Sequence, residues 1–233
     1  MRALIFAAGR GERMRPLTEH TPKPLLMAGG KPLVVWHLEK LAAVGVRDVV
    51  LNVSWLAECF EPALGDGSRW GLRLHYSFEG PEPLETGGGM LQALPLLGQE
   101  PFIVVNADVW TDYDFRLLPE SLRGLCHLLL VDNPAQHPRG DFHLDAQGML
   151  RVGQQPMLTY SGIGIYRPEI LHDWRDIIGG RESSDARAVP RFKLAPLLHA
   201  AISNGRAEGS WHRGRWTDVG TPERLRNLDE QLA

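Results

Sequence analysis

The beginning of the chain constrains its fold most strongly, because a short apolar run passes directly into a glycine-rich loop. Ala3 to Phe6 is typical of a buried strand, and residues 7–14 then read A-A-G-R-G-E-R-M. Gly9 and Gly11 have no Cβ, so their backbone N–H groups can approach phosphate oxygens closely. A buried strand that opens into such a loop indicates a site for a polyphosphate.

Two cationic side chains, one in the loop and one shortly after it, are suited to phosphate. The planar guanidinium of Arg13 can bind two phosphate oxygens at once. Lys23 adds an ammonium from the segment T-P-K-P-L at 21–25, which its prolines stiffen. The simpler alternative is a tight strand–helix turn without a ligand. Arg13, Pro16 and Lys23 at these spacings favour the phosphate site.

Two common phosphate motifs do not match this loop. The P-loop pattern G-x-x-x-x-G-K-[ST] is absent from the chain. The dinucleotide pattern G-x-G-x-x-G begins at Gly9 and Gly11 but has Met14 in its third glycine position. The next strand also ends near Leu51-Asn52-Val53, without the acid that would bind a ribose. The sequence therefore argues against a dehydrogenase.

Strand and helix patterns alternate through the first half of the chain. Val34, Leu38 and Leu41 share one helical face, and Gly45 is a stop signal. Strands are expected at 2–7, 46–53, 72–76, 102–105 and 125–131, and helices at 32–44 and 87–97. This order predicts an α/β fold, a Rossmann-like, doubly wound, mostly parallel sheet with right-handed crossovers and helices on both faces.

The second half of the chain is less regular. Residues 133–158 are typical of turns with short hairpin strands, and residues 179–192 lack periodicity and predict a mobile loop. A strand is expected at 163–166 and a helix at 194–203. The last helix has Thr221 as its N-cap and Pro222 in its first turn, with three leucines facing inward: Leu225, Leu228 and Leu232.

Two aspartates are candidate metal ligands. Asp108 follows the strand at 102–105, and Asp218 lies in W-T-D-V-G-T just before the last helix. Ligands of open α/β sheets bind beyond the carboxyl ends of the strands, where the glycine-rich loop also lies. Mg²⁺ prefers one or two carboxylates together with phosphate oxygens and water. The alternatives are a strand-end cap or Asx-turn for Asp108 and a helix cap for Asp218.

Composition narrows the class of protein. The 233 residues carry a formal net charge of −3, which gives no reason to expect nucleic acid or an anionic membrane as a partner. We find no apolar run of the roughly 18 residues that a membrane span requires and no signal-peptide pattern at the N-terminus. Cys59 and Cys126 lie in apolar stretches, and we expect reduced, buried thiols in a cytoplasmic protein. The nine histidines form no zinc pattern.

Taken together, these segments resemble the sugar-1-phosphate nucleotidylyltransferase family over nearly the whole chain. The resemblance is carried by the loop A-A-G-R-G-E-R-M-R-P-L-T, by T-P-K-P-L, by L-E-T-G-G-G at 84–89, by N-A-D at 106–108, by Y-S-G-I-G-I-Y at 160–166 and by W-T-D-V-G-T at 216–221. Within the family, five segments resemble a uridylyl-transferring branch: 64–72, 83–89, 105–115, 131–134 and 139–142.

The resemblance implies a nucleotide-diphospho-sugar transferase fold with a small sugar-binding β subregion. It implies one domain over 1–233, with a nucleotide-binding part at about 1–115, a sugar-binding part at about 116–215 and a metal-ligand segment with the closing helix at 216–233. The implied substrates are a nucleoside triphosphate, UTP preferred, and a sugar 1-phosphate, with Mg²⁺ as cofactor and no obligate protein partner.

The resemblance also implies roles for single residues. The catalytic set would be Arg13, Lys23, Asp108 and Asp218, and the last two would bind the metal. The nucleotide would be bound by Ala8, Gly9, Gly11, Glu12, Arg13, Lys23, Glu79, Glu85 and Gly88. The sugar would be bound by Asn106, Asp141 and Gly162.

The chain departs from the family at one position. Many members carry E-K-P before the Y-S-G-like strand, and its lysine contacts the sugar phosphate, whereas this chain has Gln154-Gln155-Pro156. Arg139, Arg191 and Lys193 are the possible substitutes. Three other functions stay open: a guanylyl- or thymidylyltransferase acting on another sugar, a non-catalytic sugar-nucleotide sensor, and a nucleotide-binding module.

Overall fold

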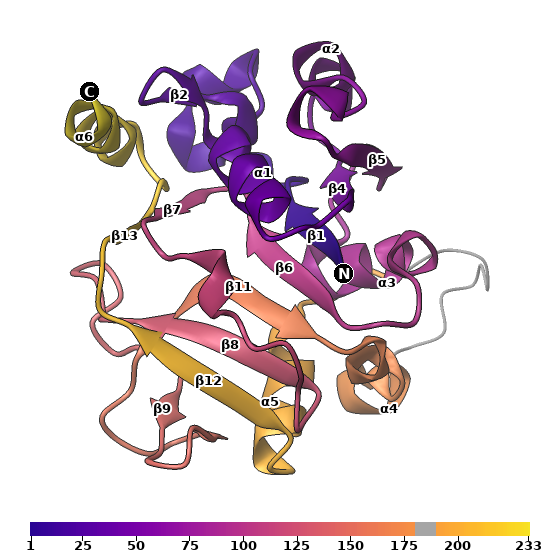
Figure 1. Ribbon diagram of the computed structural model, residues 1–233, viewed down its shortest axis with the longest axis vertical. Helices are drawn as coiled ribbons and strands as arrows, with labels where there is room; N and C mark the ends of the chain where they lie inside the picture. The colour runs from indigo at the N-terminus through magenta and orange to yellow at the C-terminus, as the bar shows by residue number, and fades with distance from the viewer. Residues whose placement is uncertain (180–189) are drawn as a thin grey trace. The chain divides into compact units, whose positions relative to one another are not determined.

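In the computed structural model, which describes residues 1–179 and 190–233, contacts divide the chain into two units (Figure 1). The first unit contains residues 1–83, 105–117 and 214–233, and the second contains residues 84–104 and 118–213. The chain therefore leaves the first unit and returns to it twice. Most of the loop predicted at 179–192 lies outside the described residues.

Three parallel strands build the sheet of the first unit: β1 (Arg2–Phe6), β4 (Asp48–Val53) and β5 (Arg73–Phe78). Leu51 of β4 pairs with Ile5 on one side and with Tyr76 on the other. Helix α1 (Leu33–Ala43) connects β1 to β4 and buries Val34, Leu38 and Leu41, as its periodicity predicts. A parallel pair needs such a crossover, because its two strands run in the same direction.

Short elements complete the first unit. Two antiparallel pairs, β2 (Met27–Ala28) with β3 (Lys31–Pro32) and β7 (Val109–Thr111) with β13 (Trp216–Asp218), join segments near the ends of the longer strands. Helix α2 spans Phe60–Leu64. Single 3₁₀ turns are formed by Glu12–Met14, Leu17–Glu19, Lys23–Leu25, Ala57–Cys59, Ser68–Trp70 and Phe115–Leu117.

Helix α6 (Pro222–Leu232) closes the first unit on an apolar cluster. Thr221 caps the helix, because its side-chain oxygen accepts the N–H of Arg224 (3.3 Å). Leu225 and Leu228 are buried and Leu232 is half-buried, so the predicted inner face is confirmed. They pack with residues from the loop, from α1 and from the segments around β2, β7 and β13: Met14, Leu26, Ala28, Leu33, Trp36, Trp110 and Val219.

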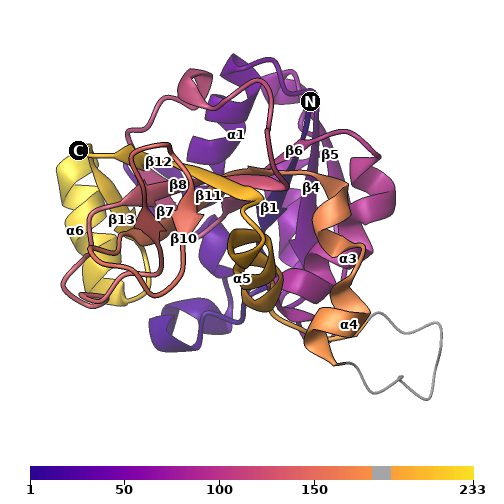
Figure 2. The same ribbon diagram turned by 90° about the horizontal axis from the view of Figure 1, so that it is seen from below.

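In the second unit, β8 (Cys126–Val131) lies between two partners (Figure 1). β12 (Ala207–His212) is parallel to β8, and β11 (Thr159–Tyr166) is antiparallel to it. All six residues of β8 are buried. Helix α5 (Ala195–Ser203) contacts β12 and covers this sheet (Figure 2).

The rest of the second unit consists of short segments around this sheet. Helix α3 (Glu85–Leu97) leads toward β6 (Phe102–Asn106), which carries the chain into the first unit. The hairpin of β9 (His143–Leu144) and β10 (Leu150–Arg151) lies in the stretch predicted to hold turns. A 3₁₀ helix (Pro168–Leu171) and α4 (Trp174–Ile178) complete the unit, and α4 contacts α5.

The predicted α/β class with mostly parallel strands is confirmed, and the differences are shifted ends of elements and elements that were not predicted. The strand predicted at 46–53 begins at Asp48, because the N–H of Val46 bonds to Leu41 and closes the turn after α1. The strand predicted from residue 72 begins at Arg73, since the N–H of Leu72 bonds to Gly67. The strands β2, β3, β7, β12 and β13 were not predicted.

Burial separates the two cysteines. Both thiols are free, and burial raises the pKa of Cys126 to about 12. Cys59 is half-exposed, so the prediction that it is buried was wrong; it ends a 3₁₀ turn instead of lying in a strand. Among the described residues, every helix is too short or too polar to cross a membrane.

Candidate active site

The glycine-rich loop starts from a fixed point at the end of β1. The N–H of Ala7 donates to Asn52 Oδ1 (2.7 Å), and Asn52 Nδ2 donates to Glu79 Oε1 (2.6 Å). Asn52 and Glu79 are both buried; Asn52 lies near the end of β4, and Glu79 follows the neighbouring strand β5. A buried amide with two well-made hydrogen bonds sets the direction in which the chain leaves β1.

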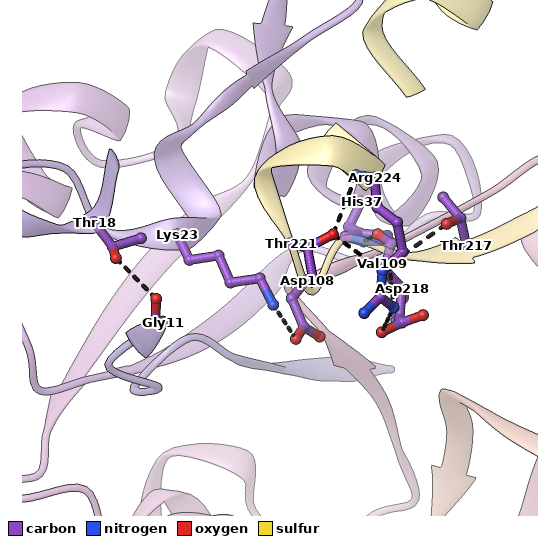
Figure 3. Close-up of polar contacts among 10 residues, drawn as sticks. All are labelled: Gly11, Thr18, Lys23, His37, Asp108, Val109, Thr217, Asp218, Thr221 and Arg224. Atoms are coloured by element: carbon purple, nitrogen blue, oxygen red, sulfur yellow. Dashed lines mark hydrogen bonds and ion pairs between the residues drawn. The ribbon is translucent and has the colours of Figure 1, made fainter. Parts of the chain in front are cut away.

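Gly11 is required by its backbone and by its surroundings. Its φ is +63°, a backbone conformation that residues other than glycine rarely adopt. A Cβ there would lie 2.9 Å from Cγ2 of Thr18 and 3.3 Å from Cβ of Lys23. The carbonyl of Gly11 accepts the hydroxyl of Thr18 (2.8 Å) and the N–H of Met14 (2.8 Å). The loop is therefore folded onto the segment that carries Lys23 (Figure 3).

Gly9 differs, because a Cβ at this position would meet nothing within 4 Å. Packing inside the protein therefore does not demand a glycine at this position. Glu12 and Arg13 are exposed on the 3₁₀ turn that follows, while Ala8 is buried. The part of the loop from Gly9 to Arg13 is thus open to a ligand.

Lys23 is a buried cation paired with a predicted metal ligand. Pro22 and Pro24 flank it, and its side chain is only 9% exposed. Its Nζ donates to Asp108 Oδ2 at 2.6 Å. Asp108 is 41% exposed, so this carboxylate also faces solvent.

Asp108 lies where four segments of the first unit meet. The N–H of Ala107 donates to the carbonyl of Phe6 (3.0 Å), which places the end of β6 beside the end of β1. The carbonyl of Asp108 accepts the N–H of Val219 (2.7 Å). Asp108 therefore lies at the carboxyl ends of the strands, as expected for a ligand site of an α/β fold.

His37 contacts the residue that follows Asp108. It projects from α1, and its Nε2 lies 2.7 Å from the carbonyl oxygen of Val109. Burial lowers the pKa of His37 to about 4, so the ring is neutral near pH 7. A carbonyl can only accept, so Nε2 carries the hydrogen and donates it. Nδ1 is buried without a partner among the described residues.

Asp218 reaches the same place from the C-terminal segment. It ends β13 opposite Val109 of β7, one residue from Asp108. The structure therefore brings the two predicted metal ligands together, although 110 positions separate them in the sequence. Figure 3 shows both carboxylates directed to the same side of this strand pair.

Asp218 has an arginine partner from the first turn of α6. Arg224 Nη1 forms an ion pair with Asp218 Oδ2 and also donates to the Asp218 carbonyl (3.2 Å). Its Nε donates to the capping hydroxyl of Thr221 (3.4 Å). Thr221, not Asp218, caps the helix, so the alternative role considered for Asp218 was wrong.

The chemistry of these groups fits a magnesium ion. Within the described parts of the chain there is no group of three or more His, Cys, Asp or Glu residues that could hold a metal. Asp108 and Asp218 supply two carboxylates, which is the share that Mg²⁺ takes from a protein when a phosphorylated substrate and water supply the remaining ligands. The two acids lie beside Lys23, and the chemistry of this group suits a divalent cation bound together with a polyphosphate.

Four predicted ligand-binding residues belong to the second unit. Glu85 has a φ of +62° and forms an ion pair with Arg191 (3.3 Å). The N–H groups of Gly87 and Gly88 both donate to the carbonyl of Phe192, at 2.9 and 3.1 Å. A Cβ on Gly88 would lie 2.4 Å from the carbonyl oxygen of Pro190. These glycines therefore admit the segment at 190–192.

The two predicted sugar-binding residues of this unit are held internally. Asp141 Oδ2 accepts the N–H of Tyr160 (2.8 Å), and Asp141 Oδ1 lies 3.0 Å from His137 Nε2. Gly162 has a φ of +81° at the irregularity of β11 between Tyr160 and Gly164. Asn106, the third, ends β6 in the first unit and is half-buried. Arg139 and Lys193, two possible phosphate anchors, are exposed.

Sequence reasoning missed three residues that build this site: His37, Asn52 and Arg224. Asn52 is a polar residue near the end of an otherwise apolar strand, and His37 interrupts the apolar face of α1. Arg224 lies three residues after the N-cap. Each is a weak signal, because polar residues also occur at such positions without contacting a site.

A family model described as nucleotidyl transferase matches residues 2–123. The chain belongs to this family. Among curated members, N-acetylmuramate alpha-1-phosphate uridylyltransferase of Neisseria meningitidis serogroup B is 48% identical over 97% of this chain and 96% of its own. The protein of the same name from Caulobacter vibrioides is 34% identical over 99% and 96%.

Other members of the nucleotidyl transferase family are longer. The mannose-1-phosphate guanyltransferase of Aspergillus fumigatus is 37% identical over 96% of this chain but only 62% of its own length. Among solved structures, a Bacillus anthracis protein provisionally assigned as a glucose-1-phosphate thymidylyltransferase superposes with a TM-score of 0.84 over 100% of this chain and 95% of that one, at 18% identity. That likeness concerns the fold.

Proposed function

We propose that the protein transfers a uridylyl group from UTP to N-acetylmuramic acid 1-phosphate, giving UDP-N-acetylmuramic acid and pyrophosphate, in peptidoglycan recycling. The supporting observation is likeness over nearly the full length to two uridylyltransferases of that name, at 48% and 34% identity. The shared length matters, because the guanyltransferase from Aspergillus fumigatus extends well beyond the matched region.

The proposed reaction is a substitution at phosphorus. An oxygen of the sugar 1-phosphate attacks the α-phosphorus of UTP, forming a P–O bond, while the bond from that phosphorus to the β-phosphate bridging oxygen breaks and pyrophosphate leaves. The attacking phosphate monoester is already an anion, so no side chain has to remove a proton. The task of the protein is to bring two highly charged anions together in line.

The first unit supplies groups suited to that task. Lys23, Arg13 and the N–H groups of the loop around Gly9 would bind the phosphates of UTP and stabilise charge on the leaving group. Asp108 and Asp218 would hold Mg²⁺, which would neutralise phosphate charge in the transition state. His37 keeps Asp108 in place through Val109.

The remaining roles concern recognition. Glu79, Glu85 and Gly88 would frame the uracil base, with Ala8 and Glu12 on the nucleotide, and Asn106, Asp141 and Gly162 would contact the sugar. Asn52 links Glu79 to the N–H of Ala7, so the proposed base contact is mechanically joined to the start of the loop. We further propose that the enzyme works in the cytoplasm without an obligate protein partner, nucleic acid or membrane.

The experiment is a substrate panel that measures pyrophosphate release. The purified protein is incubated with Mg²⁺, each of the four nucleoside triphosphates and a series of sugar 1-phosphates. We expect release with UTP and N-acetylmuramic acid 1-phosphate. Release with GTP and mannose 1-phosphate alone would replace the uridylyl proposal by a guanylyl one. No release with any pair would favour a sensor or a binding module.

A further inference from the structure

We propose that Lys23 holds the place of the divalent cation on Asp108 in the nucleotide-free protein and moves to the triphosphate when it binds. The carboxylate is thereby released for metal only when nucleotide is present. This inference rests on the proposed function and deepens it, because it links the binding of the two ligands.

The first observation is the Lys23–Asp108 pair itself. The ammonium lies 2.6 Å from Asp108 Oδ2, and the lysine side chain is 91% buried, while the carboxylate is 41% exposed and open to a cation from solvent. A divalent cation that approached the same carboxylate would meet the positive charge of the ammonium at contact distance. The protein therefore disfavours the metal at Asp108 as long as Lys23 stays there.

The second observation is the contrast between the two ion pairs. Arg224 is fixed to its end of the site by contacts with the Asp218 carboxylate, the Asp218 carbonyl and the Thr221 hydroxyl. Gly220 makes room for this arrangement, since a Cβ there would lie 2.9 Å from Arg224 Nη2 and 3.0 Å from Asp218 Oδ2. The ammonium of Lys23, in contrast, donates to one carboxylate oxygen.

This contrast between the two ion pairs indicates different roles for the two carboxylates. Asp218 is paired with an arginine that also bonds to the Asp218 carbonyl and to the Thr221 hydroxyl, and we expect this carboxylate to keep its orientation when ligand binds. Asp108 is held by a compact ammonium on a flexible stem, which can exchange one oxygen partner for another. Lys23 also lies against Gly11, so a phosphate in the loop would be within its range of motion.

The consequence is thermodynamic linkage. If a triphosphate takes the ammonium away from Asp108, the affinity of the site for metal rises, and by reciprocity metal bound at Asp108 raises the affinity for the triphosphate. The free protein would then take up little metal, and the site would be completed by both ligands together.

The test uses Mn²⁺ as the probe and measures its binding to the nucleotide-free protein by electron paramagnetic resonance. We expect K23M, which keeps an unbranched apolar stem, to bind Mn²⁺ at least about fivefold more tightly than the wild type. The matched control is K31M, which removes the same charge and another lysine–carboxylate pair, Lys31–Glu39, away from the site. It should bind Mn²⁺ like the wild type.

A second measurement covers the case in which K23M does not fold. Binding of UTP is measured by calorimetry with EDTA present, for D108N and D218N. Both variants remove one negative charge at the site, but only D108N releases Lys23. We expect UTP to bind D108N at least about threefold more tightly than D218N.

The outcomes separate this inference from the proposed function. The inference fails while the proposed function stands in two cases. In the first, D218N lowers Mn²⁺ affinity, but K23M does not raise it. In the second, D108N and D218N bind UTP equally. If neither aspartate variant changes Mn²⁺ binding with UTP present, the metal site fails, and this inference fails with it. Transfer activity is decided independently by the substrate panel.

Discussion

At the scale of single residues, the contacts of each side chain distinguish a role in the fold from a role in ligand binding. Gly9 and Gly11 illustrate this, because both stand in the same loop but only Gly11 has a positive φ and close neighbours. The fold therefore explains why position 11 is a glycine. It does not explain the glycine at position 9, and close approach of a ligand would, which is the reason for placing the phosphates there.

Alanine at each glycine separates the two roles. G11A is expected to lower the free energy of unfolding by more than about 1 kcal/mol, because of its positive φ and the clash with Thr18. G9A is expected to change it by less than about 0.5 kcal/mol while weakening UTP binding. Urea denaturation and calorimetry measure the two effects. Equal stability losses would refute the distinction.

His37 makes folding stability depend on pH. Its pKa falls from 6.5 in the unfolded chain to about 4 in the fold. Between these values the unfolded state binds a proton that the folded state does not, so stability falls as pH falls from 6.5 to 4. The whole shift corresponds to about 3 kcal/mol at low pH.

The variant His37→Gln tests this, because glutamine keeps an N–H donor for Val109 and does not titrate. We expect its urea midpoint to fall less steeply than that of the wild type between pH 6.5 and 4. Other titrating groups are common to both proteins and cancel in the difference. Parallel pH profiles would show that His37 does not carry the effect.

At the level of elements, the site depends on two three-residue strands and one helix cap. β7 and β13 bring Asp108 and Asp218 together, and Thr221 starts the helix from which Arg224 reaches back. These strands could not be predicted, because three residues are too few for an alternating pattern to appear. Asp218 was found as an acid before a helix, but its strand was not.

The cap of α6 therefore affects both stability and the site. T221A removes the oxygen that accepts from the Arg224 N–H and Nε, and we expect it to lower the free energy of unfolding by about 1 kcal/mol. Its kcat is expected to fall as well, since Arg224 loses one of its anchors. Serine retains the hydroxyl, so T221S should restore both values; failure to do so would argue against the capping role.

For the whole molecule, the first unit was the more predictable. Its strands β1, β4 and β5 are apolar or alternate regularly, and Gly45 ends α1 as expected. Lys23 and Asp108 could be found because prolines and a strand end mark them. His37 and Asn52 could not, because their role depends on which backbone groups the fold places opposite them.

In the second unit, local sequence patterns do not predict which distant segments pack together. The Gly-rich segment at 87–89 was predicted to contact the nucleotide. The structure shows that Gly87 and Gly88 allow close packing of Phe192 and Pro190, which lie about a hundred residues further along the chain. A pattern in one segment cannot reveal a neighbour that arrives from so far along the chain. The sugar contacts stay predictions for the same reason.

The central claim is that Lys23, Asp108 and Asp218 act together in nucleotidyl transfer. Pyrophosphate release from UTP and N-acetylmuramic acid 1-phosphate with Mg²⁺ tests it most directly. The wild type is compared with D108N and with the control D176N, which replaces an exposed aspartate of α4. We expect D108N to turn over at least about a hundredfold more slowly, with D176N unchanged. Near-normal turnover by folded D108N would contradict the claim.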